Sequence, residues 1–234
     1  MAPLDVSESQ VLRLVAGVAP LVSHLTGWNL RTGDLGVRVL ERAGCNEEIV
    51  RRRLKSAGLA LPAREADGFY ERLMARLLEE NILAAYDHGG QEIVVVRENV
   101  EEADLDGLRL VLAHELVHRG QHVRHPELFG RADALLRDVY LSRGPDGGPG
   151  DPAGAPLIRL DAIMTLLESH ARFIEDEVKR LYLPRATVRT GFNMMAFLLQ
   201  ALAPAKGRQY SDGLPAVAAA ASEGTLDSLY DSLR

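Results

Sequence analysis

A single β-rich segment between long helical stretches constrains the fold of this chain more than any other feature. It reads NILAAYDHGGQEIVVVREN (81–99), two β-rich runs around the turn sequence DHGG at 87–90. Glycines can adopt the positive φ angles that tight hairpin turns require, so we predict a β-hairpin. We therefore interpret His88 as a turn residue rather than a ligand. LGVRVL (35–40) alternates in polarity and predicts one further short strand.

Most of the remaining chain has the apolar spacing of helices. We expect helices at about 8–25, 46–57, 64–80, 105–122, 126–141, 157–183, 187–203, 208–221 and 224–233. The segment RGPDGGPGDPAGAP (143–156) has the Gly/Pro composition of a flexible loop. Helices, a few strands and then helices to the end predict an α+β fold, mostly helical with a small mixed sheet.

Charge and cysteine content exclude several classes of protein. The formal net charge is −6 and the arginines are scattered, whereas nucleic-acid binders usually carry a basic stripe. We interpret the one dense basic run, VRRRLKS (50–56), as a solvated helix face. The single cysteine, Cys45, allows no intrachain disulfide and no thiolate zinc site. An acidic start with Asp5 and Glu8, and no apolar run of membrane-spanning length, predict a cytoplasmic protein without nucleic-acid or membrane partners.

The expected helix at 105–122 contains the motif HELVH, which includes His114, Glu115 and His118. Residues four apart lie on one helix face, so the two imidazoles can bind one metal ion. Zinc needs a third protein ligand and keeps a fourth position for water, which Glu115 would deprotonate before passing the proton to a leaving amine. Apolar residues on both sides of the motif favour a metal site over a polar surface helix. We therefore predict a catalytic metal site here.

The third ligand does not follow the H-E-x-x-H-x-x-G-x-x-H spacing, because Gln121 and Arg124 occupy the glycine and histidine positions. His122 and His125 remain as lesser alternatives. Glu168 is the better candidate, because it is central in an apolar helix at 160–178, where a carboxylate is costly unless a cation coordinates it.

Two nearby residues on that helix are kept as fallback ligands. His170 points away from Glu168 around the helix and is interpreted as a polar surface residue. Glu175 lies in a more charged turn, which we expect to be more exposed.

Three short patches resemble known metallopeptidases. HELVH together with LLESHARF (166–173) resembles the gluzincins, in which two histidines and a downstream glutamate bind zinc. The closing segment, 205–233, resembles the K-x-x-Q-Y-x-x-G segment of the zincin-like metallopeptidases of type 2. The resemblance implies a zincin-like domain with the motif on a central helix, one Zn²⁺ per chain and a peptide or protein substrate. It assigns His114, His118 and Glu168 as ligands and Glu115 as the catalytic base.

The chain departs from these families at two positions. Ser169 stands where glycine is common, and Arg172 stands where an aspartate orients a ligand histidine in thermolysin-like enzymes. The sequence therefore does not identify the group that orients the imidazoles. Tyr210 is a candidate for stabilising the oxyanion, although it also fits a core tyrosine at a helix start, and Arg172 is the alternative.

We expect residues 81–234 to form the catalytic domain and residues 1–80 to pack on it, with the loop at 143–156 inserted. The function that this predicts is a zinc-dependent metallopeptidase. The alternatives are a zincin-fold protein that keeps the metal as a binding or regulatory module without turnover, and a structural helical domain without metal.

Overall fold

The computed structural model describes residues 6–43, 45–59, 82–101, 105–142, 154–186 and 210–233. Across these ranges the chain is mostly helical with one three-stranded mixed sheet, which confirms the expected α+β class. The predicted helices at 64–80 and 187–203 and most of the predicted loop at 143–156 lie outside the described residues.

The sheet has the strand order β1-β3-β2. β2 (Ala84–Asp87) and β3 (Glu92–Val96) form the predicted antiparallel hairpin, with Tyr86 opposite Ile93. β1 (Gly36–Leu40) pairs with β3 in parallel. β2 therefore lies at an edge of the sheet and pairs with another strand on one side only.

The helices agree closely with the apolar periodicity. They are α1 (Glu8–Thr26), α2 (Cys45–Ser56), α4 (Arg97–Glu101), α5 (Leu105–Arg124), α6 (Pro126–Ser142), α7 (Gly154–Tyr182), α9 (Tyr210–Glu223) and α10 (Leu226–Asp231), with a 3₁₀ turn η1 (Thr32–Asp34). α7 begins at Gly154, inside the segment that we predicted to be loop. α6 begins at Pro126, since proline is well tolerated at the first position of a helix.

α1 has clear end signals. The hydroxyl of Ser7 accepts a hydrogen bond from the backbone N–H of Gln10, which caps the N-terminus of the helix. Gly27 ends the helix at φ 69°, a left-handed conformation that glycine adopts without steric cost. Trp28 follows at 9% exposure and packs edge-on against His170 in the core.

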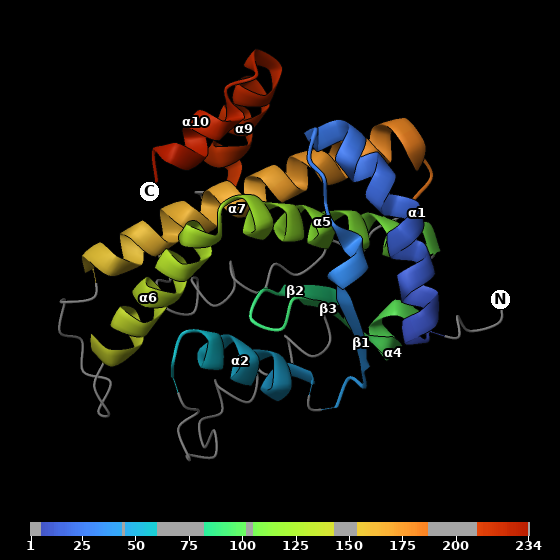
Figure 1. The fold of residues 1–234 in the computed structure, drawn as a ribbon, viewed down its shortest axis with the longest axis horizontal. Helices are drawn as coiled ribbons and strands as arrows, with labels where there is room; N and C mark the ends of the chain where they lie inside the picture. The colour runs from blue at the N-terminus through green and yellow to red at the C-terminus, as the bar shows by residue number, and fades with distance from the viewer. Residues whose placement is uncertain are drawn as a thin grey trace.

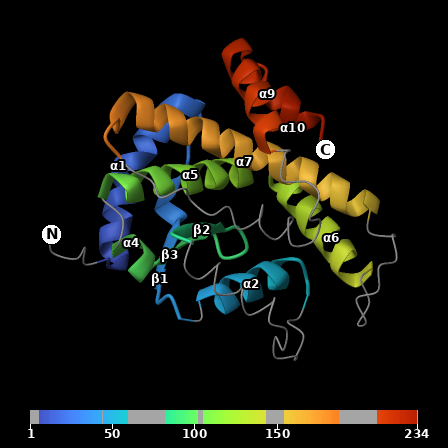
Figure 2. The ribbon, with the colours of Figure 1, turned by 180° about the vertical axis from the view of Figure 1, so that it is seen from behind.

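The elements stack in layers around α5. In Figure 1, α7 runs beside α5 on one side, the sheet lies on the other side, and α2 covers the far face of the sheet. α1 crosses both long helices, and α9 and α10 pack beyond α7, as Figure 2 shows from behind. Since α5 is covered by α7, α1, α6 and β2, it is buried on most of its surface. Among the described helices, none combines the length and the apolar character needed to cross a lipid bilayer.

Candidate metal centre

Three predicted ligands converge where α5 packs against α7. His114 and His118 lie one turn apart on α5, and their Nε2 atoms are 3.1 Å apart. Glu168 of α7 brings Oε2 to 3.2 Å from Nε2 of His114 and Oε1 to 3.6 Å from Nε2 of His118. In the described part of the chain, these residues form the one group of three or more potential ligands compact enough to hold a metal ion.

The separations of these donor atoms fit a tetrahedral divalent cation. Zinc binds imidazole nitrogen and carboxylate oxygen at about 2.0–2.2 Å, so two ligand atoms on one tetrahedron lie about 3.4 Å apart. The separations between the three side chains, 3.1 to 3.6 Å, bracket that length. Two imidazoles and one carboxylate are also a ligand set of catalytic zinc sites, which keep one position open for water.

Two side chains that sequence reasoning did not assign fix the imidazole rings. Nδ1 of His114 lies 3.1 Å from Oε2 of Glu175, and Nδ1 of His118 lies 2.8 Å from Oε1 of Gln121. An ionised carboxylate accepts, so His114 donates from Nδ1, and Nε2, which faces His118 and Glu168, is the atom that would bind a metal ion. Glu175 therefore orients the imidazole of His114.

Spacing could have revealed both of these partners. Glu175 follows Glu168 by seven residues, two helical turns, and therefore returns to the same face of α7. Gln121 follows His118 by three residues on α5. The prediction that Glu175 is exposed is wrong, because only 7% of it is accessible. Its charged sequence neighbours suggested a solvated turn, but Glu175 itself faces α5.

The electrostatics of the group favour a cation. Burial lowers the pKa of His114, but hydrogen bonds that its ring donates to the carboxylates of Glu168 and Glu175 outweigh this and hold the pKa well above its ordinary value. Burial also lowers the pKa of His118, but the negative charge of Glu168 outweighs burial and leaves this pKa raised. Burial opposes ionisation of Glu168, yet the charge of His118 and the hydrogen bond from His114 hold its pKa far below the usual range. The arrangement therefore stabilises positive charge among these side chains.

Glu115 is buried next to this group but contributes no donor atom to it. Its Oε2 accepts a hydrogen bond of 2.7 Å from the backbone N–H of Tyr86, on the outer edge of β2. Burial raises the pKa of Glu115, while the positive charges of His114 and His118 act in the opposite direction. A carboxylate with a raised pKa, fixed beside a candidate metal site, has the properties of a general base.

The other histidines considered as ligands lie elsewhere. His122 is directed at Tyr86, with 2.9 Å between Nδ1 and the phenol oxygen, and His125 stacks on Tyr230 with ring centroids 4.2 Å apart. His170 is 1% exposed, so the prediction of a surface residue is wrong. It points away from Glu168 as expected, but that side of α7 is also buried, against Trp28 and Tyr230.

The structure describes the side chain of only one of the two candidates for oxyanion stabilisation, Arg172. Tyr210 begins α9, and its side chain lies outside the described residues. Arg172 is about half-exposed, and its guanidinium pairs with Glu175 and Asp176 at 3.3 Å each. Arg172 therefore contacts the partner of His114 rather than the ligands. Gly213 of the K-x-x-Q-Y-x-x-G segment packs closely on Ser169, the neighbour of Glu168.

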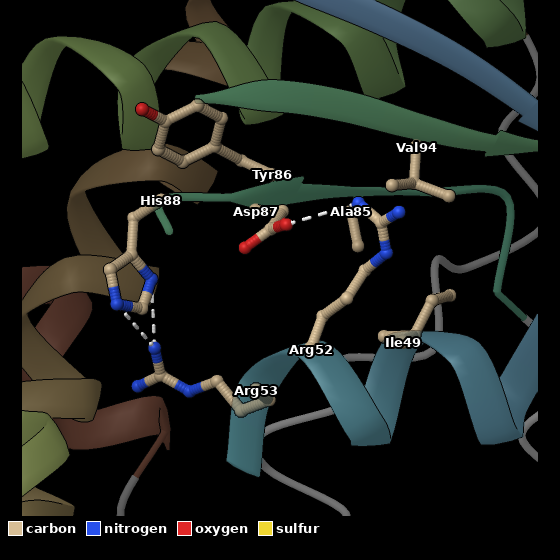
Figure 3. Close-up of a pocket in the computed structure, with 8 residues that line it drawn as sticks. All are labelled: Ile49, Arg52, Arg53, Ala85, Tyr86, Asp87, His88 and Val94. Atoms are coloured by element: carbon tan, nitrogen blue, oxygen red, sulfur yellow. Dashed lines mark hydrogen bonds and ion pairs between the residues drawn. The ribbon is translucent and has the colours of Figure 1, made fainter. Parts of the chain in front are cut away.

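A small pocket lies between α2 and the outer face of the hairpin (Figure 3). Arg52 and Arg53 line it from α2, and their side chains are only 17% and 14% exposed. Arg52 pairs with Asp87, and Arg53 pairs with Asp133 of α6. The prediction of a solvated face is therefore wrong for these two arginines. His88 lies in the hairpin turn, as predicted, and contacts Arg53 at 2.8 Å.

Comparisons with known proteins identify no relative: the chain matches no family model, no curated protein and no solved structure.

Proposed function

We propose that this protein is a zinc-dependent hydrolase that cleaves peptide bonds, with Glu115 as the general base. The observation that carries the proposal is the convergence of His114, His118 and Glu168 from two helices, beside a buried carboxylate that is not part of the triad. A purely structural metal site needs no such additional carboxylate, whereas hydrolysis needs a general base that accepts a proton from water.

The ligands would be His114 and His118 through Nε2 and Glu168 through its carboxylate. A zinc ion held there would act as a Lewis acid on the substrate carbonyl and lower the pKa of water to about 7. Glu175 and Gln121 would keep the two imidazoles in the required tautomer.

The remaining chemistry belongs to Glu115. The oxygen of the attacking water forms a bond to the carbonyl carbon, and one of its protons passes to Glu115. The same proton then moves to the nitrogen of the breaking C–N bond, so the amine leaves neutral. The N–H of Tyr86 holds Oε2, and we assign the proton transfer to Oε1.

The edge strand supports a peptide as the substrate class. β2 lies at the edge of the sheet and packs along α5, the helix that supplies both histidines and Glu115. An extended peptide can add to such an edge through main-chain hydrogen bonds. The resemblance of HELVH and LLESHARF to gluzincin motifs points to the same class.

Glu115→Gln separates catalysis from metal binding. Zinc content should match that of wild type, because Glu115 provides no ligand atom, and cleavage of a peptide library should fall by about 10²- to 10⁴-fold. Glu223→Gln, at an exposed position at the end of α9, is the matched control and should cleave like wild type. Unchanged cleavage in Glu115→Gln would exclude Glu115 as the base. Wild-type protein that binds zinc but cleaves no library peptide would instead indicate a binding module without turnover.

A further inference from the structure

A buried chain of hydrogen bonds leads from His118 to the C-terminal helix α10. Nδ1 of His118 is 2.8 Å from Oε1 of Gln121, and Nε2 of Gln121 is 2.9 Å from the phenol oxygen of Tyr230. That oxygen is 2.7 Å from Nδ1 of His170. Gln121 and Tyr230 have 0% exposure and His170 has 1%, so the chain is shielded from water.

The carbonyl of Leu167 fixes the direction of the chain. It lies 2.9 Å from Nε2 of Gln121, and a carbonyl can only accept, so the amide nitrogen must face Leu167 and Tyr230. The amide oxygen then faces His118, which must donate from Nδ1. Nε2 of His118 thereby faces the other two proposed ligands. Tyr230 accepts from Gln121, which leaves its own hydroxyl proton available for Nδ1 of His170.

Packing fixes Tyr230 itself. Its ring stacks on His125 with an interplanar angle of 8° and lies edge-on to Trp28, with 6.4 Å between ring centroids. α10 is further attached to the end of α5, because Asp227 pairs with Arg124 at 2.6 Å. The hydroxyl of Tyr230 is therefore held at one place relative to α5.

We propose that Tyr230 is a positioning residue for the metal centre, which acts on His118 through Gln121 and makes α10 necessary for full zinc affinity. This inference rests on the metal-binding part of the proposed function and is independent of turnover. A core tyrosine with only a packing role would contribute to stability and leave the zinc affinity unchanged.

Tyr230→Phe tests the proposal, because it keeps the stacked ring and removes only the hydroxyl. We expect the zinc dissociation constant, measured by competition with a chromophoric chelator, to rise about 3- to 10-fold. This is less than the 10- to 100-fold expected when the direct partner of a ligand is lost, because Gln121 keeps its bond to Leu167. Tyr182→Phe, on the exposed end of α7, is the matched control and should bind zinc like wild type. Circular dichroism of the metal-free variants verifies that they are folded.

Gln121→Met provides a second, independent variant, since it removes the acceptor for His118 and the donor for Tyr230 together. Zinc affinity should fall about 10- to 100-fold, and adding Tyr230→Phe to this variant should cause no further loss. The absorption spectrum of the Co²⁺-loaded protein should change in both single variants. Wild-type affinity in Tyr230→Phe or in Gln121→Met, or fully additive losses in the double variant, would overturn the proposal. A wild-type protein that binds no zinc would overturn the metal site itself, a different result from either of these.

Discussion

His122 is the third histidine along the face of α5 that begins with His114 and His118, yet its environment is different. Its Nδ1 lies 2.9 Å from the phenol oxygen of Tyr86, and its ring packs on Phe129 with centroids 5.0 Å apart. Among the described residues, no carboxylate forms a hydrogen bond or an ion pair with its ring. The imidazole therefore lacks the anionic partner that His114 has in Glu175.

This environment predicts a pH-dependent contribution to stability. Burial, and then the positive charges of His88 and Arg119, lower the pKa of His122 to about 4, with Asp133 acting in the opposite direction. The unfolded chain binds the corresponding proton near pH 6.5. Unfolding therefore takes up a proton between these two values. The stability that comes from a neutral His122 is fully present above pH 6.5 and is lost as the pH falls toward 4.

The measurement is the free energy of unfolding as a function of pH by urea titration. In His122→Asn, the slope between pH 4 and 6.5 should be smaller than in wild type by up to one proton per molecule. His24→Asn alters an exposed histidine of α1 and serves as the control, with a slope like that of wild type. Identical slopes in wild type and His122→Asn would show that His122 is not held neutral by the fold.

Residues differ in how far sequence alone could place them. His114 and His118 could be placed because four-residue spacing is a local property of any helix. Glu168 could be placed because a carboxylate among apolar neighbours requires a partner. Tyr230 could not, because its link to His118 depends on how α10 docks on α5, which is a tertiary contact without a local pattern.

At the level of elements, the packing of α5 against the segment after α1 depends on Gly120. A Cβ at this position would lie 2.7 Å from Cε3 of Trp28 and 3.0 Å from Cδ2 of Leu30. The indole cannot easily move, because its ring is buried and lies edge-on to His170 at 5.0 Å. The absence of a side chain at position 120 therefore allows the close approach of these two segments.

Gly120→Ala should accordingly lower the free energy of unfolding by about 1–3 kcal/mol, although alanine is the better helix former. Gly130→Ala in α6 is the matched control, because nothing lies within 4 Å of a Cβ built there. That substitution should stabilise the protein by up to about 1 kcal/mol. Denaturant unfolding of both variants measures the difference, and a neutral or stabilising effect at position 120 would contradict the close packing.

The elements themselves were largely predictable, for a physical reason. Periodicity identified α5, α7 and the β2–β3 hairpin, because burial on one face leaves a regular apolar pattern. Periodicity did not show which helices are covered on both faces. α7 is covered on both sides, so His170 lies in the interior although it is polar and opposite Glu168. The same limit applies to α2, because Arg52 and Arg53 pair with carboxylates of the hairpin and of α6 that are distant in sequence.

In the whole molecule, the candidate metal centre joins segments that are far apart in the chain. His118 and Glu168 are 50 positions apart by their residue numbers, and they meet because α5 and α7 pack side by side. Three helices contribute to the centre: α5 and α7 with the ligands, and α10 with Tyr230 behind Gln121. A cation bound there would cross-link these helices only in the folded protein, because the unfolded chain does not bring the ligands together.

Zinc should therefore stabilise the protein by linkage. At a free zinc concentration 100 times the dissociation constant, the free energy of unfolding should rise by about 2.7 kcal/mol, and a chelator should reverse the change. His118→Ala removes one ligand and should abolish most of this increase, whereas His24→Ala, at an exposed site on α1, should retain it. Thermal and urea unfolding with and without zinc measure the effect. If zinc stabilised His118→Ala as much as wild type, the ion would be binding elsewhere, and the α5–α7 junction would not be the metal site.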